Sequence, residues 1–146
     1  MDSVTLKRAT SDDKQEVADI EKKTSSEIYH ARISEKEIND FFENNVIYLI
    51  KNGDVCVGFT SYENISEKSV HIDGLVIKEE YRRHGYAKQA MAILFDKLSD
   101  CSRIELVTHP HNNNALCLYL SIGFYIESWQ DNYFGDGQPR LMLVKK

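Results

Sequence analysis

The chain has 146 residues, with 18 Lys and Arg against 23 Asp and Glu and a formal net charge of −5. This length suits one globular domain, so we expect a single domain over residues 1–146. The acidic balance argues against a nucleic-acid partner, because phosphate backbones attract clustered Lys and Arg. The longest mostly apolar stretch, residues 115–126, contains Ser121 and Gly123 and is too short for a membrane span, so no membrane partner is expected.

The N-terminal residues and the cysteines indicate a cytoplasmic protein. The sequence after Met1 is polar and lacks the basic and apolar regions of a signal peptide. Cys56, Cys101 and Cys117 are widely spaced and form no CxxC pair, which is typical of reduced thiols inside the cell. The histidines show no ligand spacing, so no metal site is expected.

The first part of the chain predicts one strand and two helices. Residues 4–8 form the strand, and Thr10 or Ser11 would cap the first helix. The apolar face of this helix has helical spacing: Val17, Ile20, Thr24 and Ile28. A second, short helix is predicted from residue 34, because residues 34–37 have the spacing of a capping box.

A hairpin and a third strand follow. Residues 46–51 and 55–62 are rich in β-forming side chains, and Asn52-Gly53 between them predicts a type I′ turn. In the third run, residues 69–77, the apolar alternation slips by one residue across Asp73-Gly74. A glycine at such a slip predicts a β-bulge at residues 73–75, which can leave backbone groups available to a ligand. The alternative is an irregular strand without a function.

The second half alternates helices and strands. A helix is predicted from Tyr86, a strand over residues 103–108, a helix around residues 115–122, and strands over residues 124–129 and 140–144. The predicted order is therefore βααβββαβαββ, a mixed α/β (α+β) domain around one sheet.

A basic, glycine-containing loop precedes the helix at Tyr86. Its sequence is Arg82-Arg83-His84-Gly85-Tyr86-Ala87, with Lys88 one residue further. A loop entering a helix N-terminus exposes N–H groups and the positive end of the helix dipole, so it can bind phosphate. A solvated turn is the alternative. The chain contains neither GxxxxGK[ST] nor GxGxxG, so a P-loop and a Rossmann dinucleotide site are not supported.

A second motif lies around the following helix. Asn112 or Asn114 could cap this helix or bind the amide of a ligand, and Tyr119 lies on its apolar face. Taken by itself, Tyr119 is better interpreted as a core aromatic whose hydroxyl reaches the edge of the core.

Together the two motifs resemble the GNAT superfamily of N-acetyltransferases. The resemblance rests on Arg-x-x-Gly-x-Ala at residues 82–87, followed by Asn-x-x-Ala-x-x-Leu-Tyr-x-x-x-Gly-Phe at residues 112–124, and on the element order. It implies a single GNAT-like domain with a mostly antiparallel, twisted sheet flanked by helices, and acetyl-CoA as the acetyl donor. The residues that it implies for cofactor binding are Leu75, Val76, Ile77, Arg82, Arg83, His84, Gly85, Tyr86, Ala87, Lys88, Asn112, Asn114 and Tyr119.

The resemblance also implies the reaction, acetyl transfer to a primary amine. Tyr119 would be the general acid for the departing thiolate, and a strand N–H near Leu75 or Val76 would polarise the thioester carbonyl. Asp73 or Glu105 would be the general base, with a water relay to bulk as the alternative. A covalent route through Cys117 is disfavoured because its neighbours are apolar, whereas a reactive thiolate needs a positive, exposed setting. Direct transfer in a ternary complex is therefore expected.

The acceptor is expected between the first two helices and the last hairpin. Its candidate residues are Tyr29, His30, Trp129 and Tyr133, with Asp73 nearby. Residues 131–137 resemble the tail of enzymes that acetylate protein N-termini, including the ribosomal-protein alanine acetyltransferases. Those enzymes have a Glu five residues before the Asn, where this chain has Val107. A small amine and a protein N-terminus or lysine both remain open.

Two other classes of function also remain open. One is a GNAT-fold module that binds acetyl-CoA as a regulatory signal without turnover, and the presence of Tyr119 argues against it. The other is a small protein-interaction domain in which both motifs are structural. A homodimer through the final strands is possible in each case.

Overall fold

The structure is a computed structural model that describes residues 3–26 and 28–146. In this part of the chain, seven strands form one sheet in the order β1-β2-β3-β4-β5-β7-β6. Only β4 and β5 pair in parallel, and the remaining neighbours are antiparallel. Along the chain the elements are β1 (Thr5–Arg8), α1 (Lys14–Thr24), α2 (Glu35–Asn44), β2 (Val46–Asn52), β3 (Val55–Ser66), β4 (Ser69–Ile77), α3 (Tyr86–Lys97), β5 (Arg103–Thr108), α4 (Asn113–Ser121), β6 (Tyr125–Gln130) and β7 (Arg140–Lys145). The predicted order βααβββαβαββ and the mixed α/β sheet architecture are confirmed.

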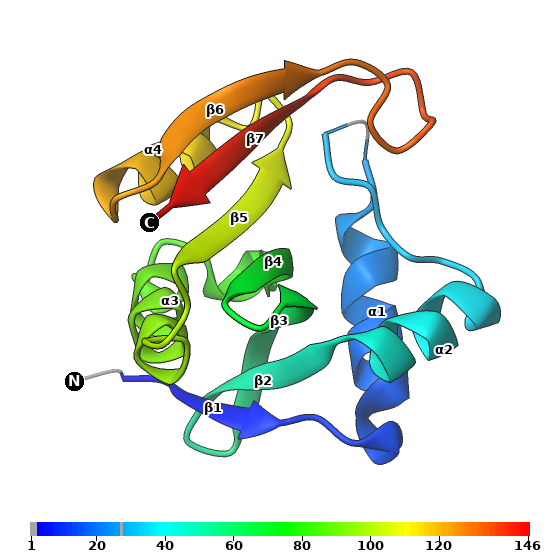
Figure 1. The fold of residues 1–146 in the computed structure, drawn as a ribbon. Coiled ribbons are helices and arrows are strands. Elements are labelled where there is room, and N and C mark those ends of the chain that lie inside the picture. The colour runs from blue at the N-terminus through cyan, green and yellow to red at the C-terminus, as the bar shows by residue number, and fades with distance from the viewer. Residues whose placement is uncertain (1–2, 27) are drawn as a thin grey trace.

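The helices cover both faces of the sheet. Figure 1 shows α1 and α2 on one side of β2–β4 and α3 on the other. On the first side Val17 and Ile20 of α1 pack with Phe41 of α2 and Phe59 of β3. On the other side one core cluster joins α3 and α4 to β5 and β7. Each fully buried apolar side chain in these clusters contributes about 1.5–3 kcal/mol. None of the helices within residues 3–26 and 28–146 is long and apolar enough to cross a membrane.

The first helix is shorter than predicted. Thr10 caps a 3-10 turn, η1 (Ser11–Asp13), and α1 follows it directly and ends at Thr24. The prediction that Ile28 continues the apolar face is therefore wrong, and Ile28 lies in the loop before α2, 38% exposed. The capping box of the second helix is confirmed: Ser34 Oγ accepts from Glu37 N at 3.0 Å, and the Glu37 carboxylate accepts from Ser34 N at 3.0 Å.

The β2–β3 hairpin turns one residue later than predicted. Asn52 pairs with Val55, so Gly53 and Asp54 occupy the two central positions of the turn. Gly53 has φ +62°, whereas Asn52 and Asp54 are not among the described residues with positive φ. A type I′ turn requires positive φ at both central positions, so that prediction is wrong. Positive φ at the first position alone is the pattern of a type II′ turn.

The bulge in β4 is confirmed. Ser61 of β3 pairs with Gly74, and its neighbour Tyr62 pairs with Ile72, so Asp73 is the extra residue. A Cβ at Gly74 would lie 2.8 Å from the Phe59 ring, which explains why glycine stands there. The bulge reorients β4 at the point where its pairing with β5 stops, because these two strands pair only over Ser69–Ile72 and Arg103–Leu106.

Candidate active site

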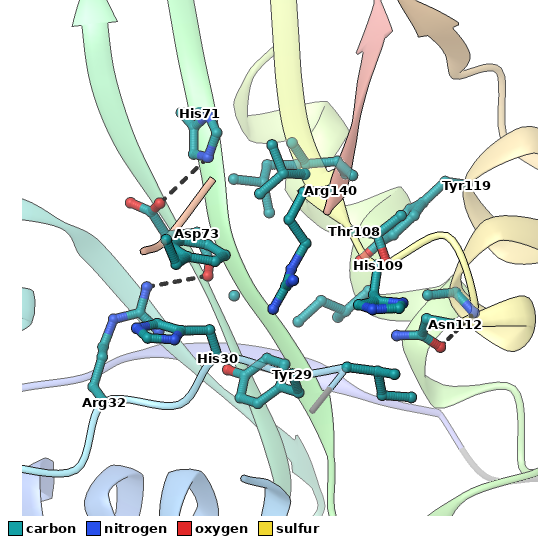
Figure 2. Close-up of a pocket in the computed structure, with 18 residues that line it drawn as sticks. Tyr29, His30, Arg32, His71, Asp73, Thr108, His109, Asn112, Tyr119 and Arg140 are labelled. Carbon is teal, nitrogen blue, oxygen red and sulfur yellow. Dashed lines mark hydrogen bonds and ion pairs between the residues drawn. The ribbon is translucent and has the colours of Figure 1, made fainter. Parts of the chain in front are cut away.

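A cavity of about 200 Å³ lies between the bulged part of β4 and the carboxyl end of β5. Its other walls come from the α1–α2 loop, the start of α4 and the end of the β6–β7 loop (Figure 2). These segments are far apart in the sequence, so the cavity exists only in the folded chain.

The far half of β4 directs backbone groups into this gap. Lys78 N donates to Val57 O at 2.8 Å, so the alternation of an antiparallel ladder turns the backbone groups of Val76 toward β3 and those of Leu75 and Ile77 away from it. No strand of the described chain pairs with β4 on that other side beyond the bulge.

The pairing of β4 with β3 changes the expectation that Leu75, Val76 and Ile77 all bind the cofactor through backbone groups. Arg82 Nε donates to Ile77 O at 2.9 Å, so that carbonyl is already engaged. Leu75 N–H, Leu75 C=O and Ile77 N–H are directed into the gap, whereas the backbone groups of Val76 belong to the sheet. Of the three residues, Leu75 and Ile77 therefore fit backbone pairing with a ligand, and the N–H that could polarise a carbonyl is that of Leu75 and not of Val76.

The basic loop has the geometry of an anion site. Arg83 has φ +69° and Gly85 has φ +77°, and Gly85 is the N-cap of α3 without a capping side chain. Left-handed residues directly before a helix direct N–H groups toward a shared point, and the first turn of α3 adds the positive end of its dipole. Arg83, His84 and Lys88 are exposed and leave this surface open to a ligand.

The Tyr86 side chain supports this loop from the core, and its ring stacks on His84 with centroids 5.4 Å apart. This side chain is 3% exposed and packs in the core beneath α3, and its hydroxyl accepts from Asn52 Nδ2 at 2.9 Å.

Arg82 also lines a second cavity, beside α1, whose wall carries both acidic and basic groups.

Tyr119 reaches the cavity from α4. The side chain is 7% exposed and packs edge-on against Phe124, with ring centroids 5.6 Å apart. No hydrogen bond to its hydroxyl is found within the described residues. Burial raises the pKa of Tyr119 well above its ordinary value, so the phenol stays protonated at neutral pH.

The two asparagines separate in space. Asn112 lines the cavity and caps α4, where its Oδ1 accepts from Ala115 N at 3.3 Å. That leaves the amide N–H2 group of Asn112 for a ligand. Asn114 is exposed in the first turn of α4 and does not line the cavity.

The two candidate bases differ in access to the cavity. Asp73 lines it, and burial raises the pKa of its carboxyl above the ordinary value, although His71 and Arg32 oppose this shift. Glu105 does not line the cavity and lies behind His71, whose Nδ1 is 2.7 Å from Glu105 Oε2. On its other side, His71 Nε2 is 3.5 Å from Asp73 Oδ1 (Figure 2). The imidazole therefore bridges the two carboxylates.

Two of the four acceptor candidates line the cavity. Tyr29 and His30 do so from the α1–α2 loop. Trp129 is 55% exposed on β6, where its Nε1 donates to Asp131 Oδ1 at 2.6 Å, and it lies outside the cavity. Tyr133 is 38% exposed and is not part of the cavity wall, although the charges of Glu105 and Asp73, after burial, raise the pKa of its hydroxyl.

The sequence motifs missed three site residues. His71 could have been found from its spacing, because residues 71 and 73 share one face of a regular strand. Arg32 and Arg140 carry no sequence signal. Arg32 bonds the buried Glu21 at 3.2 Å and the Asp73 backbone carbonyl at 3.2 Å, and it thereby ties the α1–α2 loop to the bulge.

A comparison of the sequence with protein families identifies the family of this chain. Residues 14–124 match the model of the acetyltransferase (GNAT) family. The chain belongs to the GNAT acetyltransferase family. No curated protein matches the chain.

Solved structures share the GNAT fold. A GNAT family acetyltransferase from Elizabethkingia anophelis with acetyl-CoA bound is similar at TM-score 0.81 and 15% identity, covering 100% of this chain and 99% of that one. The ribosomal-protein-S18-alanine N-acetyltransferase from Escherichia coli gives TM-score 0.81 and 18% identity, covering 97% and 92%. Arabidopsis thaliana Naa50 in complex with the bisubstrate analogue CoA-Ac-MVNAL gives TM-score 0.81 and 20% identity, covering 99% of both chains.

The match to the GNAT family model covers only part of the cavity wall. It includes the anion loop, the β4 bulge and Tyr119, and it ends at Phe124. The segment that carries Phe134 and Arg140 lies beyond it, although both residues line the cavity. The match to the family model therefore does not extend to the side of the cavity formed by the β6–β7 loop.

Proposed function

We propose that the protein is an N-acetyltransferase that moves an acetyl group from acetyl-CoA to a primary amine by direct transfer in a ternary complex. The observation that carries this proposal is the gap between β4 and β5, which has the anion loop at one end and Tyr119 in its wall. Membership of the GNAT family and the acetyl-CoA bound to the Elizabethkingia relative support the same donor.

The cofactor would use backbone groups. Its pyrophosphate would bind at the loop of Arg83 and Gly85 and the first turn of α3, where N–H groups and the dipole favour an anion. Its pantetheine arm would pair with Leu75 and Ile77 like an added strand. Asn112 Nδ2 would hydrogen-bond the same arm.

The chemical step needs one proton removed and one supplied. The amine nitrogen attacks the thioester carbonyl carbon, a C–N bond forms and the C–S bond breaks. Leu75 N–H stabilises the negative charge on the carbonyl oxygen, and Tyr119 protonates the departing thiolate. Asp73 takes the amine proton, directly or through a water, and His71 lies in place to pass it toward Glu105.

A covalent acetyl-cysteine intermediate has no support from the cavity wall. Cys117 is a free, exposed thiol on α4 and does not line the cavity. Direct attack by the amine is therefore the simpler route.

The first test is acetyl-CoA binding by calorimetry to the wild-type chain, Gly85→Glu and Gly53→Glu. Both glycines have positive φ, +77° and +62°, and neither has an atom within 4 Å of an added Cβ, so the two substitutions strain the backbone alike. Only Gly85 lies at the anion loop. There a carboxylate should weaken binding by about tenfold or more, which is 1.4 kcal/mol, while Gly53→Glu binds as the wild type does.

The outcomes separate the proposal from its alternative. No binding at acetyl-CoA on the order of millimolar refutes the proposal. Binding that Gly85→Glu loses, without thiol release for any amine in a broad panel, leaves the non-catalytic acetyl-CoA-binding module of the same fold. Thiol release that depends on an amine establishes the transferase.

A further inference from the structure

Arg140, the first residue of β7, brings a buried positive charge to the cavity. Its side chain is 2% exposed, yet it lines the cavity, and Figure 2 shows its guanidinium pointing into the space between Asp73 and His109. A buried guanidinium is unfavourable unless its charge and its N–H groups find partners.

The partners within the chain satisfy only part of this group. Arg140 Nη1 donates to Pro139 O at 3.0 Å, and Nη2 donates to Asp136 Oδ2 at 3.3 Å. The guanidinium carbon also lies 5.1 Å from the centre of the Phe134 ring, a cation–π contact that offsets part of the charge but accepts no conventional hydrogen bond. A guanidinium has five N–H donors, so these bonds leave more than half of them without an acceptor in the described chain.

The ion pair with Asp136 is also shared. Asp136 Oδ1 accepts from Gln138 N at 2.9 Å, Asp136 Oδ2 lies 3.7 Å from His30 Nδ1, and the carboxylate is 26% exposed. Asp136 therefore anchors the β6–β7 loop as well as balancing Arg140, which itself lines the cavity.

The opposite wall of the cavity has the complementary chemistry. Asp73 presents a carboxylate at the bulge, next to the Leu75 N–H that would hold the thioester carbonyl. A molecule with an amino group on the Asp73 side and a carboxylate on the Arg140 side would satisfy both walls. The planar fork of Arg binds a carboxylate through two parallel hydrogen bonds.

The size and wall of the cavity favour a small acceptor. The space is about 200 Å³. His30 stacks on Phe134 with ring centroids 4.6 Å apart and planes 7° apart, so the α1–α2 loop and the β6–β7 loop are in contact at the cavity wall. A free amino acid offers a carboxylate near its amine, whereas a protein N-terminus offers a neutral amide at that position.

We propose that the acceptor is a small amino acid whose amino group is acetylated and whose carboxylate is bound by Arg140. This inference rests on the proposed acetyltransferase function. It assigns Arg140 as the residue that selects acceptors with a carboxylate and excludes their neutral or cationic analogues.

The test compares matched acceptors that differ only in whether they carry a free carboxylate. Thiol release from acetyl-CoA is measured with a panel of free amino acids, the corresponding amino-acid amides, and short peptides. The wild-type protein should prefer the acid by about tenfold or more in kcat/KM, since a charged hydrogen bond is lost with the amide. Arg140→Met should abolish this preference, chiefly by raising KM for the acids, and Arg140→Lys should retain part of it.

A control separates binding from a purely structural role. If Arg140 only holds the β6–β7 loop through Asp136, then Asp136→Asn should remove the acid preference as Arg140→Met does, and the inference is wrong. We expect Asp136→Asn to keep the preference. Equal or better use of amides or peptides by the wild type, or acetyl-CoA binding with no amino acid acetylated, overturns this inference and leaves the proposed function standing. Failure to bind acetyl-CoA overturns both.

Discussion

Replacing Tyr119 by Phe distinguishes a catalytic role of the hydroxyl from a packing role of the ring. The structure predicts a large fall in kcat and little change in stability. The ring is 7% exposed and packs on Phe124, and Phe keeps these contacts. The hydroxyl bonds no described residue, so its removal sacrifices no hydrogen bond within this part of the chain. We therefore expect the free energy of unfolding to change by less than about 1 kcal/mol.

The rate should change far more than the stability. General acid catalysis contributes typically about 10²–10⁴ in rate, which corresponds to roughly 2.7–5.5 kcal/mol in the barrier. We therefore expect kcat of Tyr119→Phe to fall at least about 100-fold, with unchanged acetyl-CoA affinity. Since burial raises the pKa of Tyr119 above its ordinary value, the wild-type kcat should also show no loss of activity from this group below pH about 10.

The assay is thiol release at saturating acetyl-CoA, alongside urea unfolding and calorimetric binding of acetyl-CoA. Tyr125→Phe on β6 is the matched control, because Tyr125 is 44% exposed and outside the cavity. A kcat for Tyr119→Phe within about threefold of the wild type would refute the assignment of Tyr119 as the acid. Water or bulk buffer would then protonate the thiolate.

Three further predictions concern the support of the site. Ser34→Ala removes the N-cap of α2 and should lower the free energy of unfolding by about 0.5–2 kcal/mol in urea titrations, with kcat unchanged. Glu21→Ala leaves the Arg32 guanidinium, which is 20% exposed, without its carboxylate partner. It should lower the free energy of unfolding by about 3–5 kcal/mol and raise KM for the acceptor, and an unchanged urea midpoint would contradict this. Burial raises the pKa of Asp73 in the folded state, so the folded state binds the extra proton and the contribution of this carboxyl to stability falls as pH rises from about 4 through that pKa; urea midpoints of Asp73→Asn should therefore fall less, or rise more, between pH 4 and 7 than those of the wild type.

Much of the fold could be predicted from local patterns. The apolar period, the capping box at Ser34 and the phase slip at Asp73-Gly74 each depend on neighbouring residues, and the structure confirms the element order, the cap and the bulge. The errors lie at the ends of elements, where neighbouring residues allow more than one stopping point. The pairing of Asn52 with Val55 moved the turn to Gly53, and the end of α1 at Thr24 left Ile28 in a loop.

For the site, as for the fold, local sequence patterns predicted one part and missed another. The anion loop and Tyr119 could be predicted because each lies within one short motif, the loop at a helix N-terminus and Tyr119 on a helix face. His71, Arg32 and Arg140 became visible only when β4, the α1–α2 loop and the β6–β7 loop met around one cavity. Their roles depend on burial and on contacts with residues far away in the chain, and no local pattern encodes such contacts. One example is the bond from Arg32 to the Asp73 backbone carbonyl, 41 residues away. The sequence alone thus predicted the family, the anion loop and Tyr119, whereas the tertiary structure decided which charged side chains line the cavity.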